Sequence, residues 1–244
     1  MAITERERGR HPEGLTTAQE RLAIDFFNIG VGRFGDFKLQ THQNHPEAPL
    51  SPIYFNFRVL PLWPEVLNRV ADVYVQLAEK AQPYDACMGI PDTGVPLATA
   101  FSLKTETPQI IMRKEKKAGY GIEGQFLTPL PDNVKTVLVI DDLMTTAKSK
   151  ETGIDKLEEA GLKVNDVIVL LDRDQNGKGK ARLAERGVSF HAAFTMNQLL
   201  DFYARVGKIT YAELTDIRNR LAKLTEYLEK TTQTPKKTTS LSQK

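Results

Sequence analysis

The chain has 244 residues, of which 41% are hydrophobic and 26% are charged, and this composition is ordinary for a soluble α/β domain. The formal net charge of +2 does not point to nucleic acid, and no apolar run approaches the length of a membrane span, so neither kind of partner is expected. With a single cysteine and a charged N-terminus that lacks the apolar core of a secretory signal, the chain is expected in the cytoplasm.

The N-terminal part of the chain predicts one helix followed by less regular structure. Residues 1–15 are polar and are expected to be flexible. Thr16 or Thr17 can cap a helix whose apolar residues recur at helical spacing, and the glycines within residues 30–35 end it. Residues 41–52 are rich in His, Asn, Gln and Pro, which predicts a surface loop.

From residue 66 on, amphipathic stretches alternate with short apolar runs rich in β-branched residues. The expected helices lie at 66–81, 95–104, 149–160, 178–186, 195–206 and 211–230, and the expected strands at 86–90, 109–113, 136–140, 166–171 and 188–194. This alternation predicts a mostly parallel sheet covered on both faces. Residues 231–244 hold almost nothing apolar and are expected to be disordered, which leaves one folded domain over residues 16–230.

The end of the strand at 136–140 is the most informative stretch. It is followed by Asp141 and Asp142, then by a hydroxyl-rich turn at 145–149, then by a helix. Carboxylates accept hydrogen bonds from the vicinal hydroxyls of a sugar, and a helix N-terminus with its hydroxyls and N–H groups holds a phosphate. Acidic residues before a helix cap are also common in α/β domains. Spacing alone therefore leaves a sugar-phosphate site and an ordinary turn equally open.

This stretch resembles the phosphoribosyl-diphosphate (PRPP) signature of type I phosphoribosyltransferases, and other segments narrow the likeness to the orotate phosphoribosyltransferase family. The segments that carry it are, in the order in which the family has them, 34–37 with 51–56, 89–99, 113–117, 139–149 and 170–173. The likeness covers roughly residues 20–225. It implies an α/β fold with a central, mostly parallel sheet flanked by helices, and a small hood built from about residues 30–60.

The activity that the resemblance implies is the reaction of orotate with PRPP to give orotidine 5′-monophosphate and pyrophosphate, a step in the synthesis of UMP. The residues expected to bind PRPP are Asp92, Thr93, Gly94, Arg113, Lys114, Lys117, Asp141, Asp142, Leu143, Met144, Thr145, Thr146, Ala147, Lys148 and Ser149. Those expected at orotate are Tyr54, Phe55, Thr145 and Arg173, and those expected to act in catalysis are Lys117, Asp141 and Asp142. Mg²⁺ is the expected cofactor, held mainly by PRPP, without a direct protein ligand and reaching Asp142 through water.

The basic run at 113–117, followed by the glycine-punctuated residues 118–124, allows two interpretations. It is either a solvated loop or a mobile lid whose cations neutralise the diphosphate and which excludes water once closed. In the family the lid completes the site of the neighbouring subunit, which implies a homodimer. Tyr120 matches a place that the family fills with His or Tyr.

Departures from the family pattern keep other interpretations open. Ala147 stands where the family commonly has Gly, Lys148 where it has a small residue, and Gln40 where it usually has Lys. These departures allow a PRPP-binding regulatory protein that has lost catalysis, and the same fold also serves other bases. Each motif has a structural alternative as well: a tight turn with Gly94 at positive φ, core packing for the Tyr54–Phe55 pair, and a surface ion pair of Arg173 with a neighbouring aspartate.

Overall fold

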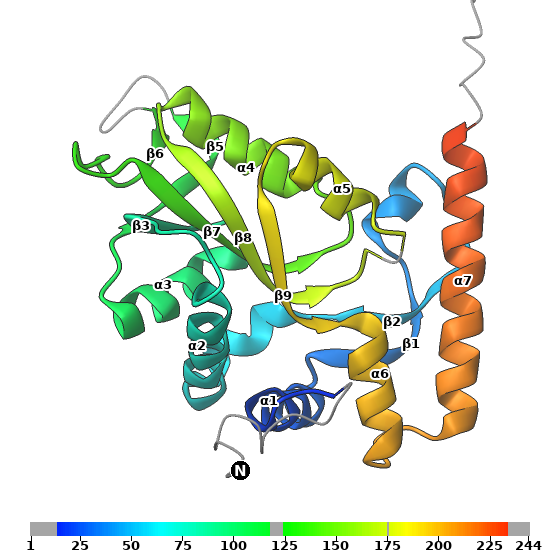
Figure 1. Cartoon of the computed structure of the whole chain (residues 1–244). Coiled ribbons are helices and arrows are strands. Elements are labelled where there is room, and N and C mark those ends of the chain that lie inside the picture. Colours follow the sequence, from blue (N-terminus) through cyan, green and yellow to red (C-terminus); the bar gives the residue numbers. More distant parts are fainter. Residues whose placement is uncertain (1–13, 118–123, 175, 234–244) are drawn as a thin grey trace, which may run out of the picture.

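The computed structural model describes residues 14–117, 124–174 and 176–233, and their centre is a five-stranded parallel sheet (Figure 1). The strands lie in the order β4-β3-β7-β8-β9 and all of their neighbours are parallel, as the sequence predicts. Their bounds are Ala86–Gly89 for β3, Gln109–Ile110 for β4, Thr136–Met144 for β7, Lys163–Asp172 for β8 and Ser189–Thr195 for β9.

Helices cover both faces of the sheet (Figure 1). Their bounds are Thr17–Asn28 for α1, Pro64–Ala78 for α2, Gly94–Thr105 for α3, Lys148–Glu159 for α4, Lys178–Glu185 for α5, Met196–Arg205 for α6 and Tyr211–Gln233 for α7. Alternate residues of β7 enter two buried clusters: Leu138 and Ile140 join α1, α2, α3 and α6, whereas Val137 and Val139 join α4 and α5. Burial on both faces explains why these strands are apolar without a break.

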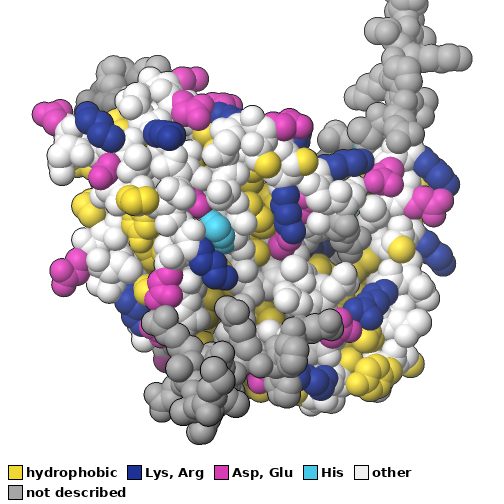
Figure 2. Space-filling view, in the orientation of Figure 1, with side chains coloured by type: hydrophobic (Ala, Val, Ile, Leu, Met, Phe, Trp, Pro, Cys, Tyr) yellow, Lys and Arg dark blue, Asp and Glu magenta, His cyan; other side chains and the backbone are white. Residues whose placement is uncertain are grey.

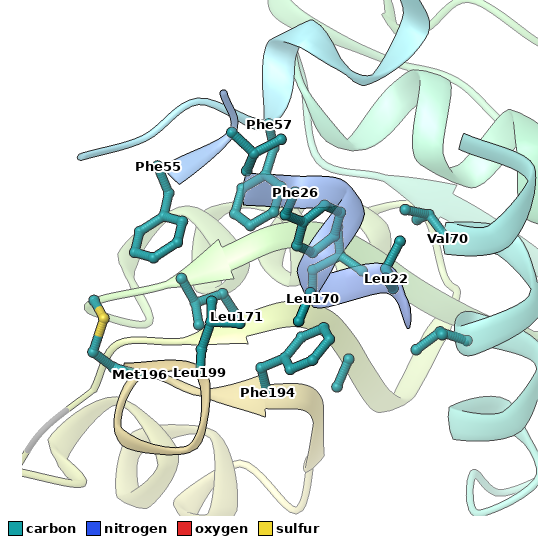
Figure 3. Close-up of a cluster of buried hydrophobic side chains, with 14 of the residues drawn as sticks. Leu22, Phe26, Phe55, Phe57, Val70, Leu170, Leu171, Phe194, Met196 and Leu199 are labelled. Atoms are coloured by element: carbon teal, nitrogen blue, oxygen red, sulfur yellow. The ribbon is translucent and has the colours of Figure 1, made fainter. Parts of the chain in front are cut away.

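Several aromatic rings pack among aliphatic side chains in the first of these clusters, part of which Figure 3 shows. The ring of Phe26, on α1, lies edge-on to Phe57 at a centroid distance of 5.4 Å and to Phe194, on β9, at 5.9 Å. Phe55 stacks on Phe57 at 6.0 Å and is only 4% exposed. This cluster joins the N-terminal segments firmly to the central sheet.

Two antiparallel pairs of strands lie beside the sheet. Their elements are β1 (Gly32–Phe37) with β2 (Ser51–Phe55), and β5 (Met112–Lys117) with β6 (Gly124–Phe126); short 3₁₀ helices follow β1 at Gln40–Gln43 and β2 at Phe57–Leu62. The β1–β2 pair is the expected hood. Helix α7 packs against β2, and its Arg220 forms an ion pair with Asp36 of β1.

Several boundaries differ from the expected ones. Thr16 is the cap of α1, because its hydroxyl accepts a hydrogen bond from the Gln19 N–H at 3.3 Å. The flexible segment expected at 1–15 is wrong at Leu15, which is 4% exposed in the core, and residues 1–13 lie outside the described residues. The surface loop expected at 41–52 is also wrong in part. His42 is buried in a 3₁₀ turn, and β2 begins at Ser51.

Other differences concern strands and the C-terminus. The single strand expected at 109–113 is two strands, since β4 ends at Ile110 in the main sheet and β5 begins at Met112 in another sheet. Helix α7 continues to Gln233, so the disorder expected from residue 231 is wrong for its last turn, where the Thr231 hydroxyl donates to the Tyr227 carbonyl at 3.0 Å. Residues 234–244 lie outside the described residues.

The order of the strands fixes where a ligand site can form. The chain winds from β3 outward to β4, then returns to lay β7 on the other side of β3. Ligands of such sheets bind outside the carboxyl ends of the strands at this reversal.

Acidic and basic side chains are interspersed over the face seen in Figure 2, in keeping with the small net charge. Among the described residues no helix is long and apolar enough to cross a bilayer.

Candidate active site

The turn from β3 into α3 lies directly against the end of β7. A Cβ atom added to Gly94 would lie 2.7 Å from the Ile140 carbonyl oxygen, and one added to Gly89 would lie 2.2 Å from the Gly94 carbonyl oxygen. Glycine at 94 is therefore required by close approach, and the positive φ expected of it in the structural alternative is wrong. The peptide bond between Pro91 and Asp92 is cis. The structure thus brings residues 91–94 beside the acidic pair.

Asp141 is turned into the protein. Its Oδ1 accepts the Asp142 N–H at 2.9 Å, and its Oδ2 lies 2.6 Å from Nζ of Lys150, on the first turn of α4. The two side chains are 7% and 3% exposed. Lys150 also donates to the Leu143 carbonyl, and the buried Tyr74 hydroxyl donates to the Asp141 carbonyl at 2.8 Å. Both oxygens of Asp141 are engaged inside the fold.

Asp142 is half-buried and faces the rim of the sheet from the same strand. Its Oδ1 accepts the Leu143 N–H at 2.7 Å. Burial raises the pKa of Asp142 to about 7, the charge of Asp141 adds to this rise, and Lys150 opposes it. Burial also raises the pKa of Tyr74, with smaller contributions from Asp142 and Asp141. Ionisation of the Asp142 carboxyl group is therefore unfavourable at this position in the protein without ligand.

The segment between β7 and α4 presents hydroxyls to solvent. Thr145, Thr146, Lys148 and Ser149 are exposed, whereas the side chains of Met144 and Ala147 are buried. Ala147 has a φ of −69°, so the alanine at this position keeps an ordinary right-handed backbone and the turn does not need glycine. Among the expected PRPP residues, Met144 and Ala147 thus have side chains that are packed into the protein.

Arg173 lies one strand further along, just after β8. Its N–H donates to the Met144 carbonyl at 2.7 Å, and its guanidinium carbon lies 5.9 Å from the centre of the Phe55 ring. Burial lowers the pKa of Arg173 to about 10, and nearby Tyr54 opposes this shift. Tyr54 is half-buried beside Phe37, with ring centroids 5.8 Å apart. Phe55 belongs to the core, so the packing alternative holds for it, although the Arg173 guanidinium lies over its ring.

The aspartates beside Arg173 have other partners. Oδ2 of Asp172 lies 2.5 Å from Nζ of Lys180, and Oδ2 of Asp174 accepts the Lys180 N–H at 3.0 Å. Both carboxylates are buried. The ion pair of Arg173 with an adjacent aspartate, the structural alternative for this residue, is therefore not the arrangement that the structure shows.

Lys114, the second residue of the basic run at 113–117, contacts the turn between β3 and α3. Nζ of Lys114, on β5, lies 3.2 Å from Oδ2 of Asp92, and both side chains are exposed. The Arg113 carbonyl accepts a hydrogen bond from the side chain of Gln125, on β6, at 2.7 Å. Residues 118–123, including Tyr120, lie outside the described residues, as does the side chain of Lys117. Lys114 of the basic run thus lies next to residues 91–94.

Lys150 is the residue of this site that the sequence interpretation missed. The signal was available, because Lys150 shares with Ile154 and Leu157 the buried face of α4, at spacings of four and seven residues. A lysine on an apolar face is ordinarily solvated at its tip. Its burial becomes visible only once α4 is packed against the end of β7.

Comparisons with known proteins identify a family and relatives of this chain. Residues 62–198 match the family described as the phosphoribosyl transferase domain. Over 189 residues the chain is 32% identical to the uridine 5′-monophosphate synthase of Bos taurus, which covers 77% of this chain and 37% of that protein. The chain thus spans less than half the length of this relative.

Shorter relatives match over most of their own length. The chain is 31% identical over 160 residues to the orotate phosphoribosyltransferase of Archaeoglobus fulgidus, which is 65% of this chain and 84% of that protein. The crystal structure of orotate phosphoribosyltransferase from Aeropyrum pernix superposes with a TM-score of 0.64 and 26% identity, over 77% of this chain and 99% of that one.

Proposed function

Because the chain belongs to the type I phosphoribosyltransferases, and among them to the orotate phosphoribosyltransferases, we propose that it transfers the 5-phosphoribosyl group of PRPP to N1 of orotate. The products are orotidine 5′-monophosphate and pyrophosphate. The observation that carries this proposal is the pairing of two strand ends. Asp142 lies near the end of β7 and the hydroxyl-rich turn follows that strand, and Arg173 follows the adjacent β8 and is joined to Met144 by a hydrogen bond.

The chemistry requires charge of both signs at this rim. As the bond from C1 of ribose to the pyrophosphate oxygen breaks, its electron pair leaves with the pyrophosphate, and positive charge develops on the ribose. Orotate N1 gives up its proton to the departing pyrophosphate or to water, and the N1 electron pair forms the new bond with inversion. A fixed carboxylate beside the ribose stabilises this positive charge, and donors around the phosphates stabilise the negative one.

We assign the ribose hydroxyls to Asp142, the more accessible of the two carboxylates, because both oxygens of Asp141 are engaged inside the fold. The 5′-phosphate fits the turn at 145–149, where exposed hydroxyls precede the N-terminus of α4. The diphosphate fits residues 91–94 with Lys114 beside them. Asp141 then positions the neighbouring residue, and the role of Lys117 remains an expectation from the family.

Orotate fits the space between Arg173 and the hood. The guanidinium fork can bind a carboxylate through two parallel hydrogen bonds, and it is held against the Phe55 ring while half-buried Tyr54 lies nearby. This placement puts a cation where the orotate carboxylate would arrive and leaves the ribose side to Asp142. The two substrates therefore meet above adjacent strands.

Mg²⁺ fits this site as a companion of the substrate. The described residues include no group of three or more His, Cys, Asp or Glu that could hold a metal ion by themselves. Mg²⁺ is usually bound through one or two carboxylates, waters and substrate phosphates. Asp142 is the carboxylate that such a hydrated ion would reach through water. When bound, Mg²⁺ would neutralise charge on the pyrophosphate.

A homodimer in the cytoplasm completes the proposal. The β5–β6 pair that carries the lid is a separate two-stranded sheet, which suits a segment shared between subunits. If Lys117 acts across a dimer, mixing inactive Lys117→Ala chains with inactive Asp142→Asn chains restores some activity, because one hybrid site has both groups intact. No recovery after verified subunit exchange would show that the lid works within its own chain.

The direct test is product formation by the purified chain with orotate, PRPP and Mg²⁺. We expect the ultraviolet band of orotate to fall as orotidine 5′-monophosphate appears, with one pyrophosphate released for each orotate consumed. Uracil and adenine in place of orotate test the alternative of another base. Tight PRPP binding without any nucleotide product would establish the regulatory protein and refute the enzyme.

A further inference from the structure

The ends of two adjacent strands carry similar arrangements of atoms. Near the end of β7, Asp141 accepts the N–H of the next residue at Oδ1 and pairs with an ammonium group at Oδ2. In the last residue of β8, Asp172 accepts the N–H of Asp174, two residues on, at Oδ1, at 2.9 Å, and pairs with an ammonium group at Oδ2. In each case the ammonium group comes from the helix that follows the loop.

The first arrangement links the two ends of residues 144–149, the phosphate turn. Lys150 lies on α4, after the turn, yet it reaches back to Asp141 and to the Leu143 carbonyl, which lie before the turn. One buried ammonium group therefore ties both ends of residues 144–149. The Asp142 side chain leaves the strand between the two groups that Lys150 holds.

The second arrangement links the end of β8 to α5, on either side of Arg173. Lys180 lies on α5 and reaches back to Asp172, while its own N–H donates to Asp174 at 3.0 Å. A Cβ atom added to neighbouring Gly179 would lie 3.0 Å from Asp174 Oδ2, so α5 is pressed against this loop. Arg173 leaves the chain between two fixed aspartates.

We propose that Lys150 and Lys180 are positioning residues, each devoted to one substrate. Lys150 holds Asp141 and through it sets Asp142 and the phosphate turn for PRPP. Lys180 holds Asp172 and through it sets Arg173 for orotate. This assignment rests on the proposed function, because it deepens the roles given there to Asp142 and Arg173.

The burial of Lys150 supports a role beyond packing. Its neighbours on the buried face of α4, Ile154 and Leu157, are apolar, so an apolar residue at 150 would continue that face. Burying an ion pair is often no better for stability than a well-packed apolar pair. What the ion pair adds here is a fixed geometry at both ends of the phosphate turn.

The experiment compares Lys150→Met with Lys180→Met, two identical substitutions in matching positions. KM for each substrate and kcat are measured, together with the dissociation constant of PRPP by calorimetry. We expect Lys150→Met to raise the PRPP constants about ten-fold or more and to change KM for orotate by less than about two-fold. Lys180→Met is expected to raise KM for orotate a few-fold and to leave PRPP unchanged.

A double variant keeps the test decisive if Lys150→Met does not fold. Lys150→Met combined with Asp141→Asn removes both buried charges and leaves an amide oxygen for the Asp142 N–H. Continued weak PRPP binding in this folded variant supports positioning by Lys150. Recovery of wild-type PRPP affinity shows that Lys150 serves only as a counter-ion and overturns the assignment.

The remaining outcomes are equally informative. Equal changes for both substrates in either single variant, or no change in either, overturn the division between PRPP and orotate. If the wild-type chain binds PRPP but forms no nucleotide, the proposed function fails. The comparison of PRPP dissociation constants between the Lys150→Met and Lys180→Met variants still decides the role of Lys150.

Discussion

The β7–α4 and β8–α5 connections have the same anchoring atoms but differ in burial and in the charge that they present. Lys150 is 3% exposed and Lys180 is 45% exposed, although each pairs with a carboxylate that is itself less than 10% exposed. The first connection presents Asp142 and the second presents Arg173. Under the proposed function, one type of aspartate–lysine anchor serves the ribose at one strand end and the anionic base at the other, according to the residue next to the anchor.

Burial decides how much each anchor contributes to stability. In the interior, removing one partner leaves a charge without compensation, whereas at a half-exposed position water replaces the lost partner. The comparison therefore predicts unequal responses to equal substitutions.

The largest effect is expected from Lys150→Met. The free energy of unfolding should fall by about 3–5 kcal/mol, because Asp141 is left buried with only one N–H donor. Urea unfolding followed by circular dichroism measures it. The double variant with Asp141→Asn should regain most of the loss, and a single variant as stable as the wild type would show that water already reaches Asp141.

Asp142→Asn should reduce kcat by about two to three orders of magnitude, the usual cost of removing one group that stabilises transition-state charge. The fold should remain intact, because Asparagine can still accept the Leu143 N–H that Asp142 accepts at 2.7 Å. Initial rates and a thermal melt of the same sample measure both. Near-native turnover would overturn the assignment of the ribose to Asp142.

Arg173→Ala should raise KM for orotate far more than KM for PRPP. Loss of charge-assisted hydrogen bonds to a buried ligand costs roughly 1.5–3 kcal/mol, or about one to two decades in kcat/KM. Arg173→Lys should rescue only part, because lysine keeps the charge but loses the planar fork. Equal losses for the two substrates would contradict the placement of orotate beside β8.

The pKa of Asp142 predicts a pH dependence of stability. The folded protein holds this proton up to about pH 7, whereas the ordinary carboxyl releases it near 3.8. The folded state thus binds more protons between these values, so the free energy of unfolding falls as the pH rises from about 4 to about 7. Urea unfolding at pH 5 and 8, in chelator and without substrate, should show a smaller fall for Asp142→Asn. Parallel curves for the two proteins would refute the raised pKa.

The smallest effect is expected from Lys180→Met on stability. Its pair with Asp172 is half-exposed on the lysine side, so its removal should cost about 1 kcal/mol or less. Lys180→Met and Lys150→Met unfolded under identical conditions provide the contrast. A loss as large as that of Lys150→Met would show that exposure of the ammonium group does not set the strength of these anchors.

Sequence patterns predicted the alternation of helices with the parallel strands of the central sheet because apolar residues on both faces of β7 and β8 leave long β-branched runs. They placed the end of β7 four residues early, at Ile140, because Asp141 and Asp142 interrupt the apolar run although the strand continues to Met144. They did not separate Asp141 from Asp142, because adjacent residues look alike until Lys150 folds back from α4. Nor did they separate Tyr54 from Phe55, whose different burial depends on the packing of Phe57 and Phe26.

The most direct test of the two-connection account is the initial rate of orotidine 5′-monophosphate formation over a matrix of PRPP and orotate concentrations. The same matrix is measured for the wild type, Lys150→Met and Arg173→Ala. The account predicts a crossed pattern, with KM for PRPP raised in Lys150→Met and KM for orotate raised in Arg173→Ala. Variants that shift both constants by the same factor would contradict the division of the substrates between β7 and β8.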